Sequence, residues 1–236
     1  MPNGDTIMKY QLAIFDLDGT LLNTLDDLAD AANHVLADAG FPVRTTDEVR
    51  RFVGNGYRKL IERAVPAGTG EEKINEVLSA FQSYYVNHCA VRTAPYPGVR
   101  EMLETLTRNG IKVAIVSNKG DAAVKELNEL YFGGLVPFAQ GECEGVRRKP
   151  APDTVNRVLE KYATDRKDAV YVGDSDVDVE TGKNAGMDCI SVLWGFRDEE
   201  FLKAHGATIF ARDTDELTKL ILGWSQRRMT PHRRGG

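Results

Sequence analysis

Two aspartates two residues apart follow a short apolar run near the start of the chain. Asp16 and Asp18 come directly after residues 12–15, which suit a buried strand of a parallel sheet. Ligands of such sheets gather where the strands end at their carboxyl edge. Because residues two apart on an extended backbone point to the same side, both carboxylates can face one cavity. Clustered carboxylates repel each other, so the pair indicates a hard divalent cation such as Mg²⁺. Taken alone, the segment also fits a strand end followed by an ordinary Asp-Gly turn.

Two further segments carry groups that suit a phosphate. Ser117 and Asn118 follow the apolar run 113–116 and offer a hydroxyl and an amide. Lys149 stands before a proline-stiffened helix start, where its cation could neutralise a carboxylate and a phosphoryl oxygen. Taken alone, Ser-Asn is also an ordinary turn pair and the basic loop an ordinary solvated loop.

A third expected strand end supplies more acid. Asp174 follows the apolar run 170–172, and Asp178 lies one helical turn later. Acids in a first helical turn also favour the helix dipole, so this segment has a second, purely structural explanation. The order of an acid pair, a hydroxyl, a lysine and a further acid favours a common site.

Strands and helices alternate along the second part of the chain, which predicts an α/β fold with a mainly parallel sheet. The expected strands are 112–116, 169–172, 189–193 and 208–210, and the expected helices are 98–109, 122–131, 152–162, 177–185 and 214–222. Between the first strand and residue 94 the apolar pattern is helical, which indicates a helical subdomain inserted after that strand. The predicted division is a core of 8–23 and 95–225, a helical cap of 24–94, and flexible termini at 1–7 and 226–236.

Composition excludes several classes of protein. With 30 basic and 35 acidic residues the chain is mildly acidic, and no basic stripe suggests a nucleic acid partner. No apolar stretch approaches the roughly 20 residues of a membrane span. The 3 cysteines are odd in number and lack Cys-x-x-Cys spacing, which suits free thiols in a reducing compartment. We therefore expect a cytoplasmic protein without a nucleic acid or membrane partner.

The order and spacing of these motifs resemble the haloacid dehalogenase superfamily, whose four motifs match residues 16–21, Ser117, Lys149 and 173–178. The resemblance covers nearly the whole chain. It implies a doubly wound, Rossmann-like core with an inserted helical cap, and phosphoryl transfer through an aspartyl-phosphate on Asp16.

The resemblance also implies a role for each acid. Asp16, the backbone carbonyl of Asp18, and Asp174 would hold Mg²⁺, with Asp178 behind these direct ligands. Asp18 would protonate the leaving oxygen and then deprotonate the attacking water.

The remaining core motifs would bind the phosphoryl group. Ser117 and the amide groups near Asn118 would hold its oxygens, while Lys149 stabilises the charge of the transition state.

Within the superfamily the chain looks most like phosphoglycolate phosphatases. The matching segments are 52–60, 117–119 and 194–197. The turn of Gly54, Asn55 and Gly56 would start a helix whose free amide groups receive a second anion, as suits a substrate with a phosphate and a carboxylate. Lys59 could assist, although the turn also fits a plain helix connection and Lys59 a surface charge.

Several alternatives share this reading of the residues. Other candidate substrates are pyrophosphate, a sugar phosphate or a nucleotide, and a phosphomutase remains open. A phosphoacceptor signalling module is the alternative from a different class, but such modules are shorter and lack an inserted cap. Residues 22–24 also depart from the family pattern, which bears on the connection to the cap rather than on the chemistry.

Overall fold

The computed structural model describes residues 9–223, so the predicted termini at 1–7 and 226–236 lie outside the described residues. A six-stranded sheet forms the core in the order β5-β4-β1-β6-β7-β8. Its strands are β1 (Leu12–Phe15), β4 (Lys112–Gly120), β5 (Ala139–Glu142), β6 (Ala169–Gly173), β7 (Asp188–Val192) and β8 (Ile209–Ala211). Every neighbouring pair is parallel.

The strand order reverses beside β1, which makes that place the natural ligand site of the sheet. From β1 the chain reaches β4 and β5 on one side, and it then crosses to β6, β7 and β8 on the other. In register, Ala13 of β1 lies beside Val113 of β4 and Val170 of β6. The carboxyl ends of these three central strands therefore meet at a topological switch point.

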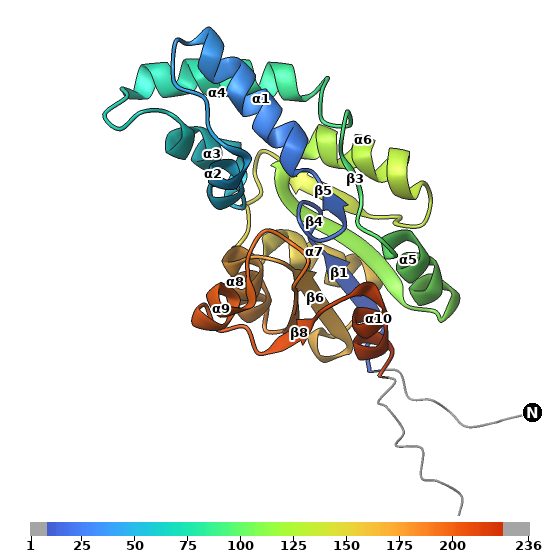
Figure 1. Cartoon of the computed structure of the whole chain (residues 1–236). Helices are drawn as coiled ribbons and strands as arrows, with labels where there is room; N and C mark the ends of the chain where they lie inside the picture. Colours follow the sequence, from blue (N-terminus) through green and yellow to red (C-terminus); the bar gives the residue numbers. More distant parts are fainter. Residues whose placement is uncertain (1–8, 224–236) are drawn as a thin grey trace, which may run out of the picture.

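Helices cover both faces of the sheet (Figure 1). Leu12 and Ile14 pack with α7 (Asp153–Tyr162), whereas Ala13 and Phe15 belong to the larger core that includes α5, α6 and α10. The bounds of these three helices are α5 (Val99–Arg108), α6 (Asp121–Phe132) and α10 (Thr214–Leu222). A further helix, α8 (Asp176–Ala185), follows β6. The alternation along β1 explains its unbroken apolar sequence, since both of its faces are buried. The prediction of a doubly wound, mainly parallel α/β core is confirmed.

Four helices lie between β1 and β4 and form a separate layer beyond the end of the sheet in Figure 1. They are α1 (Leu25–Asp38), α2 (Thr46–Phe52), α3 (Gly56–Ala64) and α4 (Glu71–Tyr85), and we call them the helical insert. The chain enters and leaves through β2 (Leu22–Asn23) and β3 (Ala94–Pro95), which pair antiparallel.

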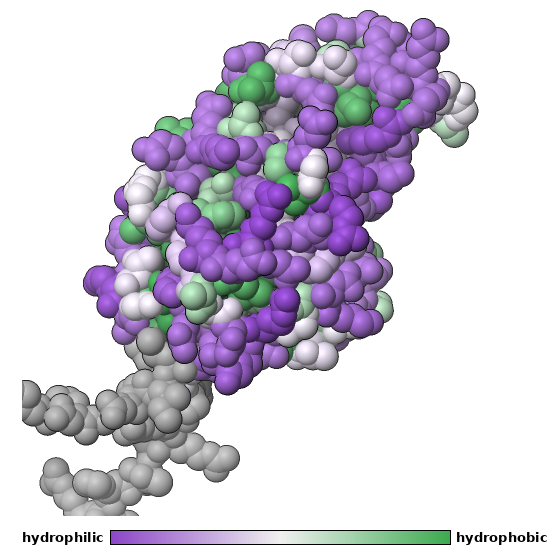
Figure 2. Space-filling view, turned by 180° about the vertical axis from the view of Figure 1, so that it is seen from behind, coloured by the Kyte–Doolittle hydropathy of each residue, from purple (hydrophilic) through white to green (hydrophobic). Residues whose placement is uncertain are grey.

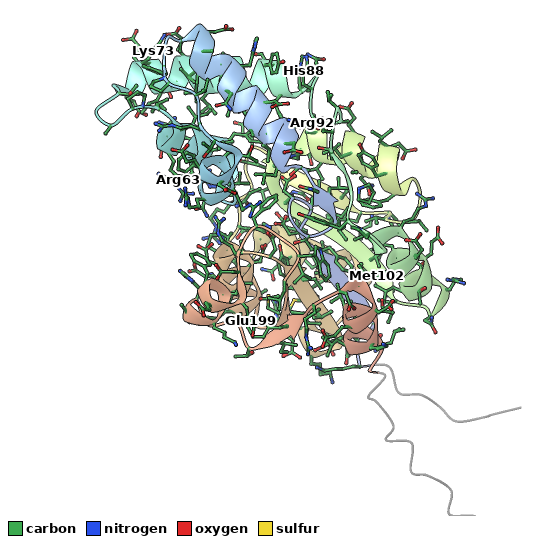
Figure 3. All side chains as sticks on the ribbon, in the orientation of Figure 1. Arg63, Lys73, His88, Arg92, Met102 and Glu199 are labelled. Carbon is green, nitrogen blue, oxygen red and sulfur yellow. The ribbon has the colours of Figure 1, made fainter. Side chains whose placement is uncertain are left out.

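The returning chain is fastened to the start of α1. The buried Asp27 carboxylate accepts hydrogen bonds from the backbone N–H groups of Arg92 and Thr93, at 2.8 to 3.0 Å. Arg92 lies beside α1, as Figure 3 shows, and its guanidinium pairs with Asp26 and Asp30. These contacts hold the chain that returns from the insert against the start of α1.

The structure contains short elements that the sequence pattern did not reveal. Each predicted strand and helix is present with small shifts at its ends, but β4 continues past Val116 to Gly120, and β5 and α9 (Glu199–Ala204) were not predicted. The β5 sequence Ala-Gln-Gly-Glu has no β-branched or aromatic residue, and α9 is only 6 residues long. Both lack the periodic signal on which sequence reasoning depends.

The surface shown in Figure 2 is mostly hydrophilic, with hydrophobic side chains in small separate groups. Within residues 9–223, each helix is too short or too polar to cross a membrane.

Candidate active site

Three strand ends and the helical insert enclose one cavity. The ends of β1, β4 and β6 contribute seven lining residues: Asp16, Asp18, Ser117, Asn118, Lys119, Asp174 and Ser175. The insert contributes six, Leu28, Val53, Gly54, Gly56, Tyr57 and Leu60, and the loop after β7 contributes Phe196 and Arg197. The cavity volume is about 30 Å³, room for one or two water molecules. The cavity between the strand ends and the helical insert is therefore narrow.

Three buried carboxylates form a cluster at the floor of the site. Oxygen atoms of Asp16, Asp174 and Asp178 lie within 4.8 Å of one another. Burial, together with the neighbouring carboxylates and against the opposing effect of Lys149, raises the pKa of Asp16 to about 7. Burial and the carboxylates of Asp178 and Asp16 also raise the pKa of Asp174 well above its usual value. A set of hard oxygen donors with this excess of negative charge fits a divalent metal ion.

Lys149 is the buried cation of the cluster. Its ammonium lies 2.9 Å from an Asp16 oxygen and 2.8 Å from an Asp178 oxygen. Burial alone would lower the pKa of Lys149, but these two carboxylates outweigh it and raise the pKa well above its usual value. Lys149 thus stays charged beside Asp16, where the sequence placed it.

Both carboxylate oxygens of Asp178 accept hydrogen bonds from protein groups. One oxygen accepts from Lys149 and from the Tyr171 hydroxyl, at 2.8 and 3.2 Å. The other accepts from the Asp174 backbone N–H and from the Ser175 N–H and hydroxyl, at 2.6 to 3.2 Å. This bonding suits a residue that orients Asp174 and Lys149 from behind.

Two glycines let the chain close around Asp174. A Cβ at Gly19 would stand 2.3 Å from an Asp174 carboxylate oxygen, and a Cβ at Gly195 would stand 2.3 Å from the Asp174 Cβ. The Phe196 N–H and the Thr20 hydroxyl donate to the same carboxylate, at 2.7 and 3.2 Å. Asp174 is therefore fixed in direction before any ligand binds.

Asp18 is paired with a lysine that sequence reasoning missed as a partner. The Lys119 ammonium lies 2.8 and 3.0 Å from the two Asp18 oxygens. Although burial lowers the pKa of Lys119, Asp18 more than compensates and the pKa is raised. The signal that could have found it is the two-residue spacing from Ser117, which puts both side chains on one side of a strand.

Asn118 joins the core to the helical insert. Its side-chain amide donates to the Lys149 carbonyl at 3.1 Å and to the Gly54 carbonyl at 3.4 Å. The amide hydrogens of Asn118, expected to bind phosphate, are therefore donated to carbonyl oxygens. The Asn118 side-chain oxygen is buried without a partner among the described residues. Ser117 lines the cavity, with its hydroxyl accepting from the Lys119 N–H at 3.2 Å.

The residues expected in the insert divide into two groups. Gly54 and Gly56 line the cavity at the start of α3, as the sequence predicted. The Asn55 side chain instead accepts from the Arg63 guanidinium at 2.8 Å, on the outer side of α3. Figure 3 labels Arg63 on that helix.

Lys59 is not brought to the cavity. Its side chain is nearly half exposed, and its ammonium pairs with Glu62 of the same helix. Helical spacing shows which residues share a face but not which face meets the sheet, so the surface-charge alternative describes this position better.

A second contact between core and insert comes from the loop after β7. The Arg197 guanidinium donates to the carbonyls of Arg50, Arg51 and Val53 at the end of α2, at 2.7, 3.3 and 2.9 Å. Cations at a helix C-terminus satisfy carbonyls that have no partner within the helix. The loop that holds Asp174 therefore also holds the insert.

A parallel doubly wound sheet carries a carboxylate cluster and a buried lysine at its switch point, an arrangement that fits an α/β enzyme with a metal- and anion-binding site. Residues 13–192 match the family model described as haloacid dehalogenase-like hydrolase. The chain belongs to this family, as its motifs indicated.

Relatives narrow the class. The chain is 35% identical over 192 residues to phosphoglycolate phosphatase 1 of Pseudomonas aeruginosa. This alignment covers 79% of this chain and 70% of the relative. It is 34% identical over 187 residues to the phosphoglycolate phosphatase of Aquifex aeolicus, with 79% and 86% covered. A crystal structure from Lactobacillus delbrueckii subsp. bulgaricus superposes with a TM-score of 0.88 at 36% identity, covering 92% of this chain and 100% of that one. The protein is a phosphatase that most resembles phosphoglycolate phosphatases.

Proposed function

We propose that this enzyme hydrolyses a small organic phosphomonoester, 2-phosphoglycolate, with Mg²⁺ and through a phosphoryl group carried by Asp16. The observation that carries the proposal is the convergence of Asp16, Asp174, Lys149 and Ser117 at one sheet edge under the helical insert. The names of the relatives support the substrate.

The proposed metal ligands are the carboxylates of Asp16 and Asp174 and the backbone carbonyl of Asp18. Mg²⁺, when bound, supplies positive charge that offsets the repulsion between Asp16 and the phosphate. Lys149 and Asp178 keep the Asp16 and Asp174 carboxylates in place.

The chain's own residues carry both half-reactions. An Asp16 oxygen attacks phosphorus, the bond to the leaving oxygen breaks, and the Asp18 carboxyl group gives that oxygen a proton. The Asp18 carboxylate then removes a proton from water, which attacks phosphorus and releases phosphate with a free Asp16 carboxylate. Ser117 and Lys149 bind the phosphoryl oxygens in both steps.

The helical insert and its two connections, residues 24–94, act as a cap on the core, which comprises 9–23 and 95–223 in the described part of the chain. Because the cavity between core and cap is only about 30 Å³, we expect the cap to move to admit substrate and then to close over it and exclude water. The amide groups at the start of α3, beside Gly54 and Gly56, receive the carboxylate of 2-phosphoglycolate. The apolar wall of Leu28, Val53 and Leu60 disfavours larger polar substrates.

Phosphate release with a small substrate panel tests this function. The panel contains 2-phosphoglycolate, pyrophosphate, a hexose phosphate and a nucleotide, each with Mg²⁺ and with EDTA. We expect kcat/KM for 2-phosphoglycolate to exceed the others by at least about tenfold, as a site built for a charged group discriminates strongly.

The exposed acid Asp165 offers a matched control, since Asp165→Asn should keep full activity while Asp16→Asn is inactive. Equal weak activity on every substrate would remove 2-phosphoglycolate but keep the phosphatase. If the wild-type enzyme released no phosphate from any substrate of the panel but isomerised the sugar phosphate, a phosphomutase would be favoured.

A further inference from the structure

Lys119 is an enclosed cation with all of its donors in use. Its side chain is fully buried, and its ammonium donates to both Asp18 oxygens and, at 2.8 Å, to the Tyr85 hydroxyl. An ammonium group has three donors, so this arrangement satisfies each of them. Lys119 belongs to β4 of the core, whereas Tyr85 ends α4 of the helical insert.

Aromatic rings from the insert close the pocket around Lys119. The Tyr85 and Phe81 rings stack with centroids 5.3 Å apart, and Tyr57 meets both rings edge-on. The Lys119 ammonium also lies 4.7 Å from the centre of the Tyr85 ring. The surroundings of this lysine are thus provided by the insert.

Stability alone does not account for the pair. Burying an ammonium costs several kcal/mol, and exchange of a buried ion pair for apolar residues is often neutral or stabilising. A leucine between three aromatic rings would pack without that cost. The charge therefore points to a need for a fixed carboxylate at Asp18.

We propose that Lys119 is a positioning residue that holds the Asp18 carboxyl group toward the leaving oxygen, and that Tyr85 makes this position depend on the seated helical insert. The inference rests on the proposed function of Asp18 as proton donor. When the insert leaves the sheet, Lys119 loses its third partner and its aromatic enclosure. Efficient proton donation is then confined to the closed enzyme.

The leaving group separates this role from a structural one. The alkoxide of 2-phosphoglycolate needs a proton as it departs, and general acid catalysis of this kind contributes about 10² to 10⁴ in rate. Acetyl phosphate is similar in size, but its acetate leaves without a proton. A misplaced Asp18 slows the first reaction far more than the second.

The experiment compares kcat for these two substrates in Lys119→Met, Lys119→Arg and Tyr85→Phe, with thermal unfolding as a check of folding. We expect Lys119→Met to lower kcat for 2-phosphoglycolate about 100-fold and for acetyl phosphate less than about tenfold. Lys119→Arg should recover part of the difference. Tyr85→Phe, which removes one hydroxyl, should shift the ratio of the two rates in the same direction by about three- to tenfold.

Tyr162→Phe is the matched control, because its buried hydroxyl has no partner among the described residues and its ring packs on the α7 side of the sheet. Equal losses on both substrates in Lys119→Met would overturn the inference. If that variant does not fold, an unchanged ratio in Tyr85→Phe would overturn it. Wild-type inactivity on both substrates would overturn the proposed function itself.

Discussion

Replacing Asp16 by Asn should stabilise the metal-free enzyme at neutral pH while abolishing activity. The raised pKa of Asp16, about 7 against an ordinary 3.8, means that the folded state prefers the protonated carboxyl group. Its contribution to stability is therefore complete below about pH 4 and is lost as the pH rises to about 7. Asparagine resembles the protonated form at every pH.

The size of the effect follows from the same values. A difference of about 3 pKa units corresponds to about 4 kcal/mol at 1.36 kcal/mol per unit. At pH 8 in EDTA, Asp16→Asn should thus be more stable than wild type by up to about 4 kcal/mol, or roughly 10 °C in Tm for a protein of this size. Below pH 4 the two should coincide. Because the pKa of Asp174 is also raised, the variant should keep a pH dependence of the same sign.

Urea unfolding at pH 4 and pH 8 measures this difference, with the exposed Asp165→Asn as control. Addition of Mg²⁺ at pH 8 should stabilise wild type by about 2.7 kcal/mol at 100 times the dissociation constant, and Asp16→Asn by less. If Asp16→Asn were less stable than wild type at pH 8 in EDTA, the claim that the folded state disfavours an ionised Asp16 would be refuted.

Three further substitutions test other parts of the site. Lys149→Met leaves buried carboxylates unpaired, and the free energy of unfolding in urea should fall by about 3 to 5 kcal/mol. Gly195→Ala puts a Cβ 2.3 Å from the Asp174 Cβ, so the Mg²⁺ concentration for half-maximal activity should rise about tenfold or more. Arg197→Met removes three hydrogen bonds to the end of α2, and kcat/KM for 2-phosphoglycolate should fall about 10- to 100-fold.

Matched controls lie on the exposed surface of the same molecule. Lys167→Met, Gly70→Ala and Arg212→Met make the same chemical changes away from the site, and a Cβ at Gly70 would meet nothing within 4 Å. An effect in a control equal to that in its partner would show that the site contacts are not responsible. Unchanged Mg²⁺ activation in Gly195→Ala would contradict the role of Asp174.

The strand-end acids were predictable because their signal is local. An apolar run followed by an acid identifies Asp16 and Asp174, and the rule that parallel strands meet ligands at their carboxyl edge brings them together. The same reasoning gives the parallel sheet, which the structure confirms. The four family motifs carry this local information in their order.

The partners of these acids were harder to predict because they come from distant parts of the chain. Lys119 was hidden because Ser-Asn suggested that the strand ended at Val116, whereas β4 runs on to Gly120. Tyr85 and Arg197 meet the core through contacts between elements, which no local pattern encodes. Lys59 is the opposite case. The sequence correctly predicted that it lies on a helix, but which face of that helix meets the core depends on packing.

Trapping of the phosphorylated enzyme tests the central claim most directly. Wild-type enzyme is mixed with radiolabelled 2-phosphoglycolate and Mg²⁺, stopped in acid within the first turnover, and its peptides are sequenced by mass spectrometry. The account predicts a hydroxylamine-sensitive phosphoryl group on Asp16 that is absent from Asp16→Asn. Rapid phosphate release by Asp16→Asn, or a phosphoryl group on another residue, would contradict it.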